Sequence, residues 1–483
     1  NLNRALHGDI IAIELLPKSQ WMLNSSVMER ADFLDQETPI NKESDNIKFL
    51  KKLQTEYEEF MKSNTIIYPT GRVVGIMRQG NRYFCGTIED NKDSEEEAMT
   101  DSNVNAEKVL FYPVDSRIPP VEVKTTKKTA LLQQRIMIRV DTWPSNSKYP
   151  SGHFIRKIGE VGKTETESEV ILLEHNVPFE PFSAKILSCL PSEGREWTIP
   201  EEEISKRLDL RGLNVCSIDP PGCKDIDDAL HCTTLPNGNL QIGVHIADVT
   251  HFVKPMSAID VEAQNRCTTV YLVEKRTDML PGLLTEHLCS LRSDGDRLAF
   301  SVLWELTPSY EIVRTEFHKT VIRSVASLTY QQAQDIVRDA NDKSKLADSI
   351  RHLLKASQHF KAQRVANGAL TLASTEVKFT LNKETHDPTD VCSYPLFDTN
   401  SLVEEFMLLA NVSVAEKILS HFPSYSVLRR HPKPKDLQMK ELQMLLKKKG
   451  HYLDYENSKS LQNSLDSANN PKDGAFNKMV RIM

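Results

Sequence analysis

The sequence contains no long hydrophobic run. In its 483 residues, no stretch approaches the ~18 consecutive apolar residues that a membrane-spanning helix needs. The N-terminus also lacks the basic segment followed by an apolar core that marks a secretory signal. We therefore expect neither membrane insertion nor secretion.

Closely spaced cysteine pairs are missing too. No two of the eight cysteines have the two-residue spacing of a zinc knuckle or ribbon. They stand at Cys85, Cys189, Cys216, Cys223, Cys232, Cys267, Cys289 and Cys392. We expect them to be reduced and mostly buried, which favours a reducing compartment, either the cytosol or the nucleus.

The chain has no surplus of positive charge, since 60 Lys and Arg residues stand against 67 Asp and Glu residues for a net charge of −7. Phosphate binding normally leaves an electropositive footprint, so this balance argues mildly against a nucleic-acid partner. It does not exclude such a partner, because acidic residues concentrate in inserts such as 89–97. A basic channel can coexist with such an acidic exterior.

What the sequence does contain is typical of a folded protein with more than one domain. Hydrophobic residues make up 39% and charged residues 26% of the chain, and its length exceeds what one hydrophobic core usually serves. Residues 1–17 read as the end of a strand-rich domain, whereas 18–65 are polar and read as an insertion or linker. Because the chain starts without Met and stops in an amphipathic segment near Met479, we expect a fragment truncated at both ends.

From 66 to about 191, short β-rich runs separated by Gly, Pro and Asn predict a small β-barrel. The clearest runs are 71–76, 135–140 and 170–173. Basic and aromatic residues are interleaved in one part of this segment, at Trp143, Lys148, Tyr149, His153, Phe154, Arg156 and Lys157. Such a surface can stack bases and neutralise phosphates, although an ordinary barrel rim has the same composition.

Beyond Glu201 the pattern is mixed. We expect strands at 241–246 and 298–305, and helices at 330–338, 345–365 and 401–420. The predicted fold class is therefore α/β plus all-β.

Four aspartates lie within ten residues, at Asp219, Asp225, Asp227 and Asp228. The Pro-Pro-Gly turn at 220–222 breaks any helix or strand, so the loop can fold back and bring the separated acids together. Converging carboxylates repel one another unless a cation neutralises them, and Mg²⁺ prefers such oxygen ligands. Magnesium held in this way supports phosphodiester hydrolysis, as in the two-metal sites of many nucleases.

A solvated acidic loop is the competing interpretation of these residues. Apolar segments flank the loop at 215–218 and 229–230, which favours a cluster framed by buried strands. The glycine and distal glutamate of an EF-hand do not fall where that calcium loop needs them.

The stretch Ile-Asp-Pro-Pro-Gly-Cys-Lys-Asp-Ile-Asp-Asp-Ala at 218–229 resembles the signature of the RNase II (RNB) exoribonucleases. Further blocks follow in that family's order, at 243–249, 269–272, 278–281, 288–291 and 403–407. Within the family, the blocks at 222–228, 368–372 and 403–411 most resemble the catalytic subunit of the eukaryotic RNA exosome. The resemblance covers essentially the whole chain.

The resemblance implies OB-type (cold-shock) β-barrels followed by a mixed α/β RNB catalytic domain. Residues 1–17 are then the end of the first cold-shock OB domain, 66–191 the second, and 200–483 the N-terminal part of the RNB domain. A PIN endonuclease domain, the end of the RNB domain and an S1 domain would lie outside the chain.

It also implies roles for single residues. The four aspartates match the family's magnesium-site aspartates, with hydrolysis depending most on Asp227. Tyr271 matches a tyrosine that stacks near the RNA 3′ end, and Glu404 a glutamate near the terminal nucleotide; taken alone, they would read as a packing residue and a surface acid. Leu372 stands where bacterial relatives have a second stacking aromatic, and the Ser-Pro-Ile-Arg-Arg-Tyr block with the family's catalytic arginine is absent from the sequence.

The resemblance thus implies a magnesium-dependent 3′→5′ exoribonuclease that hydrolyses single-stranded RNA to 5′-nucleoside monophosphates. It would act in RNA processing, including rRNA processing, and in RNA decay, with exosome core subunits as partners, in the nucleus (nucleolus or nucleoplasm) and also in the cytoplasm. Two alternatives stay open: a non-catalytic fragment that binds RNA or docks to the exosome, and a cytoplasmic paralogue. Without the arginine block, we expect the chain by itself to be inactive and poorly soluble.

Overall fold

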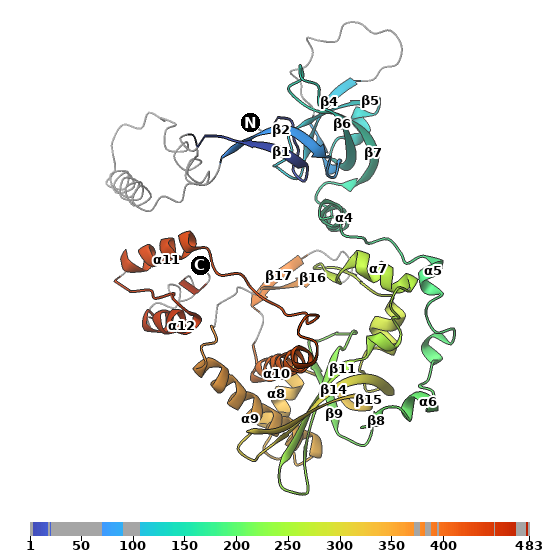
Figure 1. Cartoon of the computed structure of the whole chain (residues 1–483). Coiled ribbons are helices and arrows are strands. Elements are labelled where there is room, and N and C mark those ends of the chain that lie inside the picture. Colours follow the sequence, from blue (N-terminus) through green and yellow to red (C-terminus); the bar gives the residue numbers. More distant parts are fainter. Residues whose placement is uncertain are drawn as a thin grey trace. The chain divides into compact units, whose positions relative to one another are not determined.

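The computed structural model describes residues 3–17, 20, 70–89, 107–370, 377–381, 388–393, 396–448, 450–469 and 480–481. They form two compact units, Asn1–Val177 and Pro178–Met483 (Figure 1). Almost all of the predicted linker at 18–65 and of the acidic insert at 89–97 lies outside the described residues, as do Leu372 and Met479. Among those described, no helix is both long and apolar enough to cross a bilayer.

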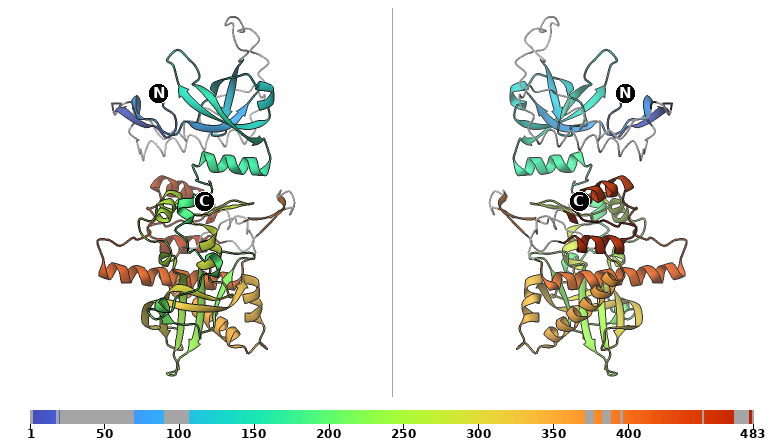
Figure 2. Two further views of the ribbon diagram at one scale, coloured as in Figure 1. Left: turned by 90° about the vertical axis from the view of Figure 1, so that its right-hand side faces the viewer. Right: turned by 90° about the vertical axis from the view of Figure 1, so that its left-hand side faces the viewer.

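The first unit is a β-barrel accompanied by a two-stranded ribbon (Figure 2). The ribbon pairs β1 (Ile10–Leu15) with β2 (Gly71–Arg78) in antiparallel fashion. The barrel closes in the order β3-β4-β5-β7-β6. Its strands are β3 (Tyr83–Ile88), β4 (Glu107–Pro113), β5 (Val121–Thr125), β6 (Gln134–Thr142) and β7 (Ser151–Glu160), and its helices are α3 (Lys128–Leu131) and α4 (Thr164–Glu174). The predicted barrel is therefore confirmed.

Alternation of side chains produces the barrel core. In β6, the buried positions are Ile136, Ile138 and Val140, two residues apart, and they pack with Phe111 of β4. Gly86 of β3 is needed for packing, because a Cβ there would lie 2.1 Å from the backbone oxygen of the adjacent strand's residue 112.

The predicted strand at 170–173 is wrong, because these residues form the second half of helix α4. A run of four apolar residues does not by itself distinguish a strand from a helix segment. The polar residues before it decide the outcome. Glu167, in the first turn of α4, accepts a hydrogen bond of 3.0 Å from Arg135 of β6, while Val170 and Leu172 are buried.

The second unit is built on a six-stranded sheet with the order β14-β11-β10-β9-β15-β8. The strands are β8 (Leu208–Asp209), β9 (Val215–Asp219), β10 (Asp228–Thr234), β11 (Leu240–Ala247), β14 (Asp296–Leu306) and β15 (Ile312–Thr329). The long β15 pairs first with β14, antiparallel, and then with β9, parallel. Two further pairs, β12 (Val270–Tyr271) with β13 (Arg276–Thr277) and β16 (Val377–Leu381) with β17 (Pro388–Ser393), are antiparallel.

Helices complete the second unit. They are α5 (Ala184–Leu187), α6 (Glu201–Ile204), α7 (Ala258–Arg266), α8 (Tyr330–Arg338), α9 (Lys345–Ala366), α10 (Asp398–His421), α11 (Asp436–Lys448) and α12 (Ser458–Ser467), with short turns η3 (Gly194–Glu196), η4 (Val249–His251) and η5 (Leu284–Leu288). The main core lies where α8, α9 and α10 pack on the sheet, and it contains Trp304, Phe360 and Phe406. The two strands predicted beyond Glu201 and the three helices are all confirmed.

The two units meet in sequence at Val177 and Pro178, whereas the second barrel domain was predicted to extend to 191. Residues 178–191 lie in the second unit instead, where Ile186 packs in a cluster with Ile259 and Leu284. The finer division into an end of one OB domain, a second OB domain and an RNB domain stays a prediction.

Candidate active site

The four aspartates lie on one loop between two neighbouring strands of the sheet. Asp219 is the last residue of β9, and Asp228 is the first residue of β10. The strands are antiparallel, so the end of one lies beside the start of the other. Gly222, with a φ of +83°, completes the Pro-Pro-Gly turn in a conformation that favours glycine. The predicted fold-back of the loop is confirmed.

Hydrogen bonds to the backbone of this loop fix it to the rest of the unit. The Ser290 hydroxyl donates to the Lys224 carbonyl at 2.7 Å and accepts from the Ile226 amide at 3.1 Å. The Leu291 amide donates to the Ile226 carbonyl at 2.9 Å, and the Ala247 amide donates to the Asp227 carbonyl at 3.0 Å. The segment at 288–291, noted in the sequence only as a family block, therefore holds the loop in place.

Asp219 and Asp228 are half-buried, Asp227 is more exposed, and the three carboxyl groups affect one another. Burial raises the pKa of Asp228 to about 7, and the charges of Asp219 and Asp227 add to the shift. Burial likewise raises the pKa of Asp219 to about 6, with added effects from Asp227 and Asp225. The pKa of Asp227 is raised as well, by burial and then by Asp225. The cluster is an acidic site that disfavours its own ionisation.

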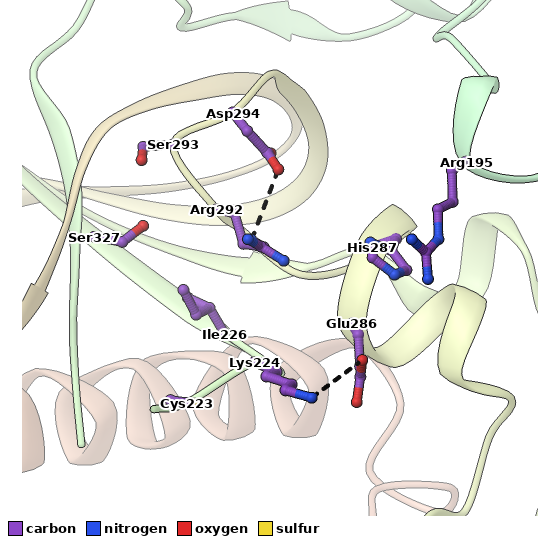
Figure 3. A pocket seen from close by; sticks show the side chains of 10 residues that line it. All are labelled: Arg195, Cys223, Lys224, Ile226, Glu286, His287, Arg292, Ser293, Asp294 and Ser327. Atoms are coloured by element: carbon purple, nitrogen blue, oxygen red, sulfur yellow. Dashed lines mark ion pairs between the residues drawn. The ribbon is translucent and has the colours of Figure 1, made fainter. Parts of the chain in front are cut away.

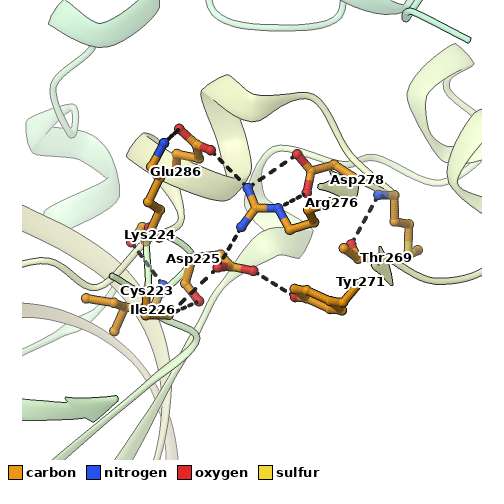
Figure 4. A network of polar contacts seen from close by, with 11 residues as sticks. Cys223, Lys224, Asp225, Ile226, Thr269, Tyr271, Arg276, Asp278 and Glu286 are labelled. Atoms are coloured by element: carbon orange, nitrogen blue, oxygen red, sulfur yellow. Dashed lines mark hydrogen bonds and ion pairs between the residues drawn. The ribbon is translucent and has the colours of Figure 1, made fainter. Parts of the chain in front are cut away.

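Asp225 makes strong contacts of its own (Figure 4). The Tyr271 hydroxyl donates to Oδ2 of Asp225 at 2.9 Å, and Arg276 forms an ion pair with Oδ1 at 2.7 Å. Arg276 also pairs with Asp278 at 2.6 Å and with Glu286 at 2.9 Å. Residues 271 and 276 are cross-strand partners in β12 and β13, which brings both to the aspartate.

Sequence reasoning missed Arg276. The available signal was its position two residues before the family block at 278–281 and five after Tyr271. This arginine lies among three carboxylates, so burial of its guanidinium is offset by their charges, which raise its pKa.

The fit of these residues to magnesium rests on their chemistry. The described residues contain no group of three or more His, Cys, Asp or Glu side chains already gathered as for a metal ion. Two observations still fit a hard cation: the mutually repelling carboxylates, and Oδ2 of Asp219, which is buried and finds no hydrogen-bond partner among the residues described. Asp219, Asp227 and Asp228 are therefore the residues that would hold magnesium, with Asp225 held aside by Arg276 and Tyr271.

The other predicted RNA-contacting residue of this unit, Glu404, lies on α10 with its side chain 60% exposed. Arg364 of α9 approaches it to 3.7 Å but pairs more closely, at 2.6 Å, with the buried Glu405. Glu404 is therefore accessible to a ligand. In the described part of the chain, no hydrogen bond or ion pair joins it to the aspartate loop.

The predicted barrel residues divide into two pairs. Lys148 and Tyr149 lie in the loop between β6 and β7, where the ammonium group stands 5.0 Å from the centre of the aromatic ring. Arg156 and Lys157 are neighbours on β7, so their side chains point to opposite faces. Arg156 forms an ion pair of 2.7 Å with Glu169 of α4, whereas Lys157 is exposed. A common RNA-binding surface for all four stays a prediction.

Comparison with known protein families finds two matches. The model described as the RNB domain matches residues 207–483, more than half of the chain. The model described as the Dis3-like cold-shock domain 2 (CSD2) matches residues 108–176, which lie within the barrel unit.

Curated relatives and solved structures agree with these matches. The Homo sapiens protein "Exosome complex exonuclease RRP44" is 46% identical over 483 residues, which cover 100% of this chain and 48% of the relative. The chain thus spans about half the length of the curated relatives it matches. Mycoplasma genitalium RNase R, solved with ribose-methylated single-stranded RNA, has a TM-score of 0.75 at 19% identity, over 100% of this chain and 67% of that one. Yeast Ssd1, a pseudonuclease, has a TM-score of 0.69 at 20% identity, over 99% and 57%.

Proposed function

The chain belongs to the RNB family, and on that premise we propose that it carries the aspartate site and the RNA-binding barrel of a 3′→5′ exoribonuclease. The single observation that supports this most is the loop from Asp219 to Asp228. It brings partly buried, mutually repelling carboxylates together at the ends of two central strands of the sheet, where a divalent cation would relieve their repulsion.

Each residue of the site has a role in this proposal. Asp219, Asp227 and Asp228 hold magnesium, and Asp227 is the one on which hydrolysis most depends. Bound magnesium supplies the Lewis acid that polarises the scissile phosphodiester. Tyr271 stacks near the RNA 3′ end, and its hydrogen bond to Asp225 ties that position to the acidic loop.

Glu404 and the barrel complete the RNA path. Glu404 lies near the terminal nucleotide, where its exposed carboxylate can accept hydrogen bonds from ribose hydroxyls, the groups that distinguish RNA from DNA. Lys148, Tyr149, Arg156 and Lys157 contact the single strand farther from the 3′ end. The products are 5′-nucleoside monophosphates.

The names of the relatives support a proposed biological setting. Because RRP44 is an exosome complex exonuclease, we propose that the protein works with exosome core subunits in RNA processing, including rRNA processing, and in decay. We place it in the nucleus, with a cytoplasmic fraction. A cytoplasmic paralogue that works without the exosome is the alternative within the enzyme class.

A second candidate is an RNA-binding protein that does not cut. The observation in its favour is that Asp225 is engaged by Arg276 and Tyr271, and that the described carboxylates are not gathered as a formed metal centre. Ssd1, a pseudonuclease, has the same fold, so the fold does not decide between the two.

A degradation assay separates the candidates. RNA with a 5′ label and a single-stranded 3′ tail is incubated with Mg²⁺ and with the protein extended through the family's arginine block, and a DNA of the same sequence serves as the substrate control. The nuclease proposal expects shortening from the 3′ end and mononucleotide release from RNA alone, lost on adding a chelator. Tight RNA binding with no cleavage at any magnesium concentration favours the second candidate.

A further inference from the structure

A cavity of about 450 Å³ opens beside the aspartate loop within the second unit (Figure 3). Small-molecule sites typically enclose about 300–1,000 Å³, so the cavity has the size of one. Cys223, Lys224 and Ile226 of the loop line it, but neither Asp225 nor Tyr271 does. The loop therefore presents alternate residues to two places: the acidic network on one side and this cavity on the other.

The two acids that line the cavity each pair with an arginine outside it. Glu286 forms an ion pair of 2.9 Å with Arg276, which does not line the cavity. Asp294 likewise pairs at 2.5 Å with Arg297, another residue that is not part of the lining. Each acid of the lining is therefore engaged by an arginine outside the cavity, although Arg276 is shared with Asp225 and Asp278.

The three cations of the lining are held only loosely. Lys224 reaches Glu286 at 4.0 Å, and Arg292 reaches Asp294 at 3.7 Å. Within the described ranges, no hydrogen bond or ion pair engages the Arg195 side chain, which points toward His287 in Figure 3. Burial and then the charge of Arg195 lower the pKa of His287, while the charge of Glu286 opposes them. The lining therefore carries three cationic side chains against two acidic ones.

We propose that this cavity binds a phosphate monoester, namely the nucleoside 5′-monophosphate that the reaction releases. The inference rests on the proposed function for the identity of the ligand. A monoester carries about −1.5 to −2 charges at neutral pH, which Arg195, Lys224 and Arg292 can match, whereas each phosphodiester of RNA carries one. Arginine binds phosphate with a planar fork of donors, and Arg195 and Arg292 bring two such forks to the lining.

Binding of adenosine 5′-monophosphate to the whole chain, without RNA or metal, tests the proposal by calorimetry. Arg195→Ala and Arg292→Ala should each weaken binding by about 10- to 100-fold, since each removes a charge-assisted contact. Arg195→Lys, which keeps the charge, should lose less than Arg195→Ala. Lys355→Ala, which removes one positive charge from an exposed position of α9, is the matched control and should bind as the parent does.

Two further measurements locate the ligand and define its chemistry. The methyl resonance of Ile226, followed by NMR in protein labelled at isoleucine methyls, should shift when adenosine 5′-monophosphate is added. Inorganic phosphate should compete with adenosine 5′-monophosphate for the site, whereas adenosine should not compete. The relative affinities of phosphate and the nucleotide then show which of the two the cavity prefers. Equal binding of adenosine, an unshifted Ile226 methyl, or full affinity in both arginine variants overturns the proposal. A short RNA without a terminal phosphate is the last ligand to test. If its binding depends on Arg195 in the same way, the cavity lies on the RNA path and the proposal of a nucleotide site is overturned.

Failure here and failure of the proposed function give different results. Magnesium-dependent RNA shortening without nucleotide binding in the cavity rejects the inference and keeps the nuclease. Nucleotide binding that depends on Arg195 and Arg292, in a protein that never shortens RNA, keeps the anion site and rejects its assignment to a reaction product.

Discussion

The Tyr271 hydroxyl donates a 2.9 Å hydrogen bond to Oδ2 of Asp225. The contact joins an exposed aromatic ring, suited to stacking on a base, to the loop that carries the acidic cluster. Burial and the contact with Asp225 raise the pKa of Tyr271 to about 12, so the hydroxyl stays a donor at any working pH. In the proposed site, a single side chain therefore links RNA binding to the position of the acidic loop.

This link gives two substitutions of Tyr271 different outcomes. Tyr271→Phe keeps the ring, so RNA affinity should change little while hydrolysis slows several-fold because Asp225 loses a partner. Tyr271→Ala also removes the stacking surface and should weaken RNA binding by ~1–3 kcal/mol. Affinities from fluorescence anisotropy and single-turnover rates distinguish the two. Equal affinity losses in both variants would show that the hydroxyl, and not the ring, contacts RNA.

In the protein extended through the family's arginine block, Asp227→Asn should abolish hydrolysis and leave RNA affinity nearly intact. The amide has the same shape as the carboxylate but lacks the charge that attracts magnesium. Asp348→Asn, an exposed change in the first turn of α9, is the matched control and should retain the parent rate. Turnover by the Asp227 variant at more than a few per cent of the parent's rate would contradict the assignment.

Arg276→Gln tests the electrostatics of the site without RNA. The change removes the cation that Asp225, Asp278 and Glu286 share, so the free energy of unfolding in a chelator should fall, by about 1–3 kcal/mol once partial solvent screening is allowed for. Magnesium should restore more stability to this variant than to the parent, because it replaces the lost positive charge.

Arg211→Gln is the control for this experiment, since Arg211 also bridges two carboxylates, Asp209 and Asp296, away from the loop. Its loss of stability should not depend on magnesium. Urea denaturation with and without Mg²⁺ measures both variants. An equal magnesium response in the two would mean that Arg276 has no connection with a cation site.

The sequence predicted the family, the barrel, the main helices and the clustering of the four aspartates because each has a local or motif-based signal. Turn residues at 220–222 determine where the loop reverses, and hydrophobic periodicity sets the helices. Arg276 and Ser290 could not be assigned in this way, since their roles depend on contacts with Asp225 and the 224–226 backbone across 51 and about 65 residues of chain. The wrong prediction of a strand at 170–173 has the same cause. The apolar run alone does not specify helix α4, and the contact of Glu167 with Arg135 joins residues far apart in the sequence.

Stability should fall on acidification because of two buried histidines. His231 and His245 contact each other at 2.8 Å between Nδ1 and Nε2, and burial lowers the pKa of His231 to about 4 and that of His245 well below its usual value. An unfolded chain takes up these protons near its pKa of ~6.5 while the folded one does not, so stability is lost as pH falls from about 6.5 toward 4. Each histidine contributes up to about 1.4 kcal/mol per pH unit.

The measurement compares the pH dependence of the unfolding free energy between variants. The raised pKa values of Asp219 and Asp228 stabilise the fold as pH falls, and this contribution is the same in every variant and cancels in the comparison. His245→Asn should flatten the fall of unfolding free energy between pH 6.5 and pH 5 relative to the parent. His318→Asn, at a half-exposed position of β15, should not. Identical slopes in all three proteins would show that the buried pair is not the source of the acid sensitivity.

The last prediction concerns the barrel charges, which the structure divides by their contacts. Lys148 and Lys157 are exposed, so each lysine that touches RNA should reduce the log–log dependence of affinity on salt by about 0.7 when replaced with Ala. Arg156 is paired with Glu169, and Arg156→Ala should therefore lower the stability of the barrel more than it changes the salt dependence. Anisotropy titrations at several salt concentrations, together with thermal unfolding, separate the two effects. If both lysine variants keep the parent's salt dependence, this side of the barrel does not face the RNA; if Arg156→Ala changes the salt dependence as they do, its pairing with Glu169 is broken when RNA binds.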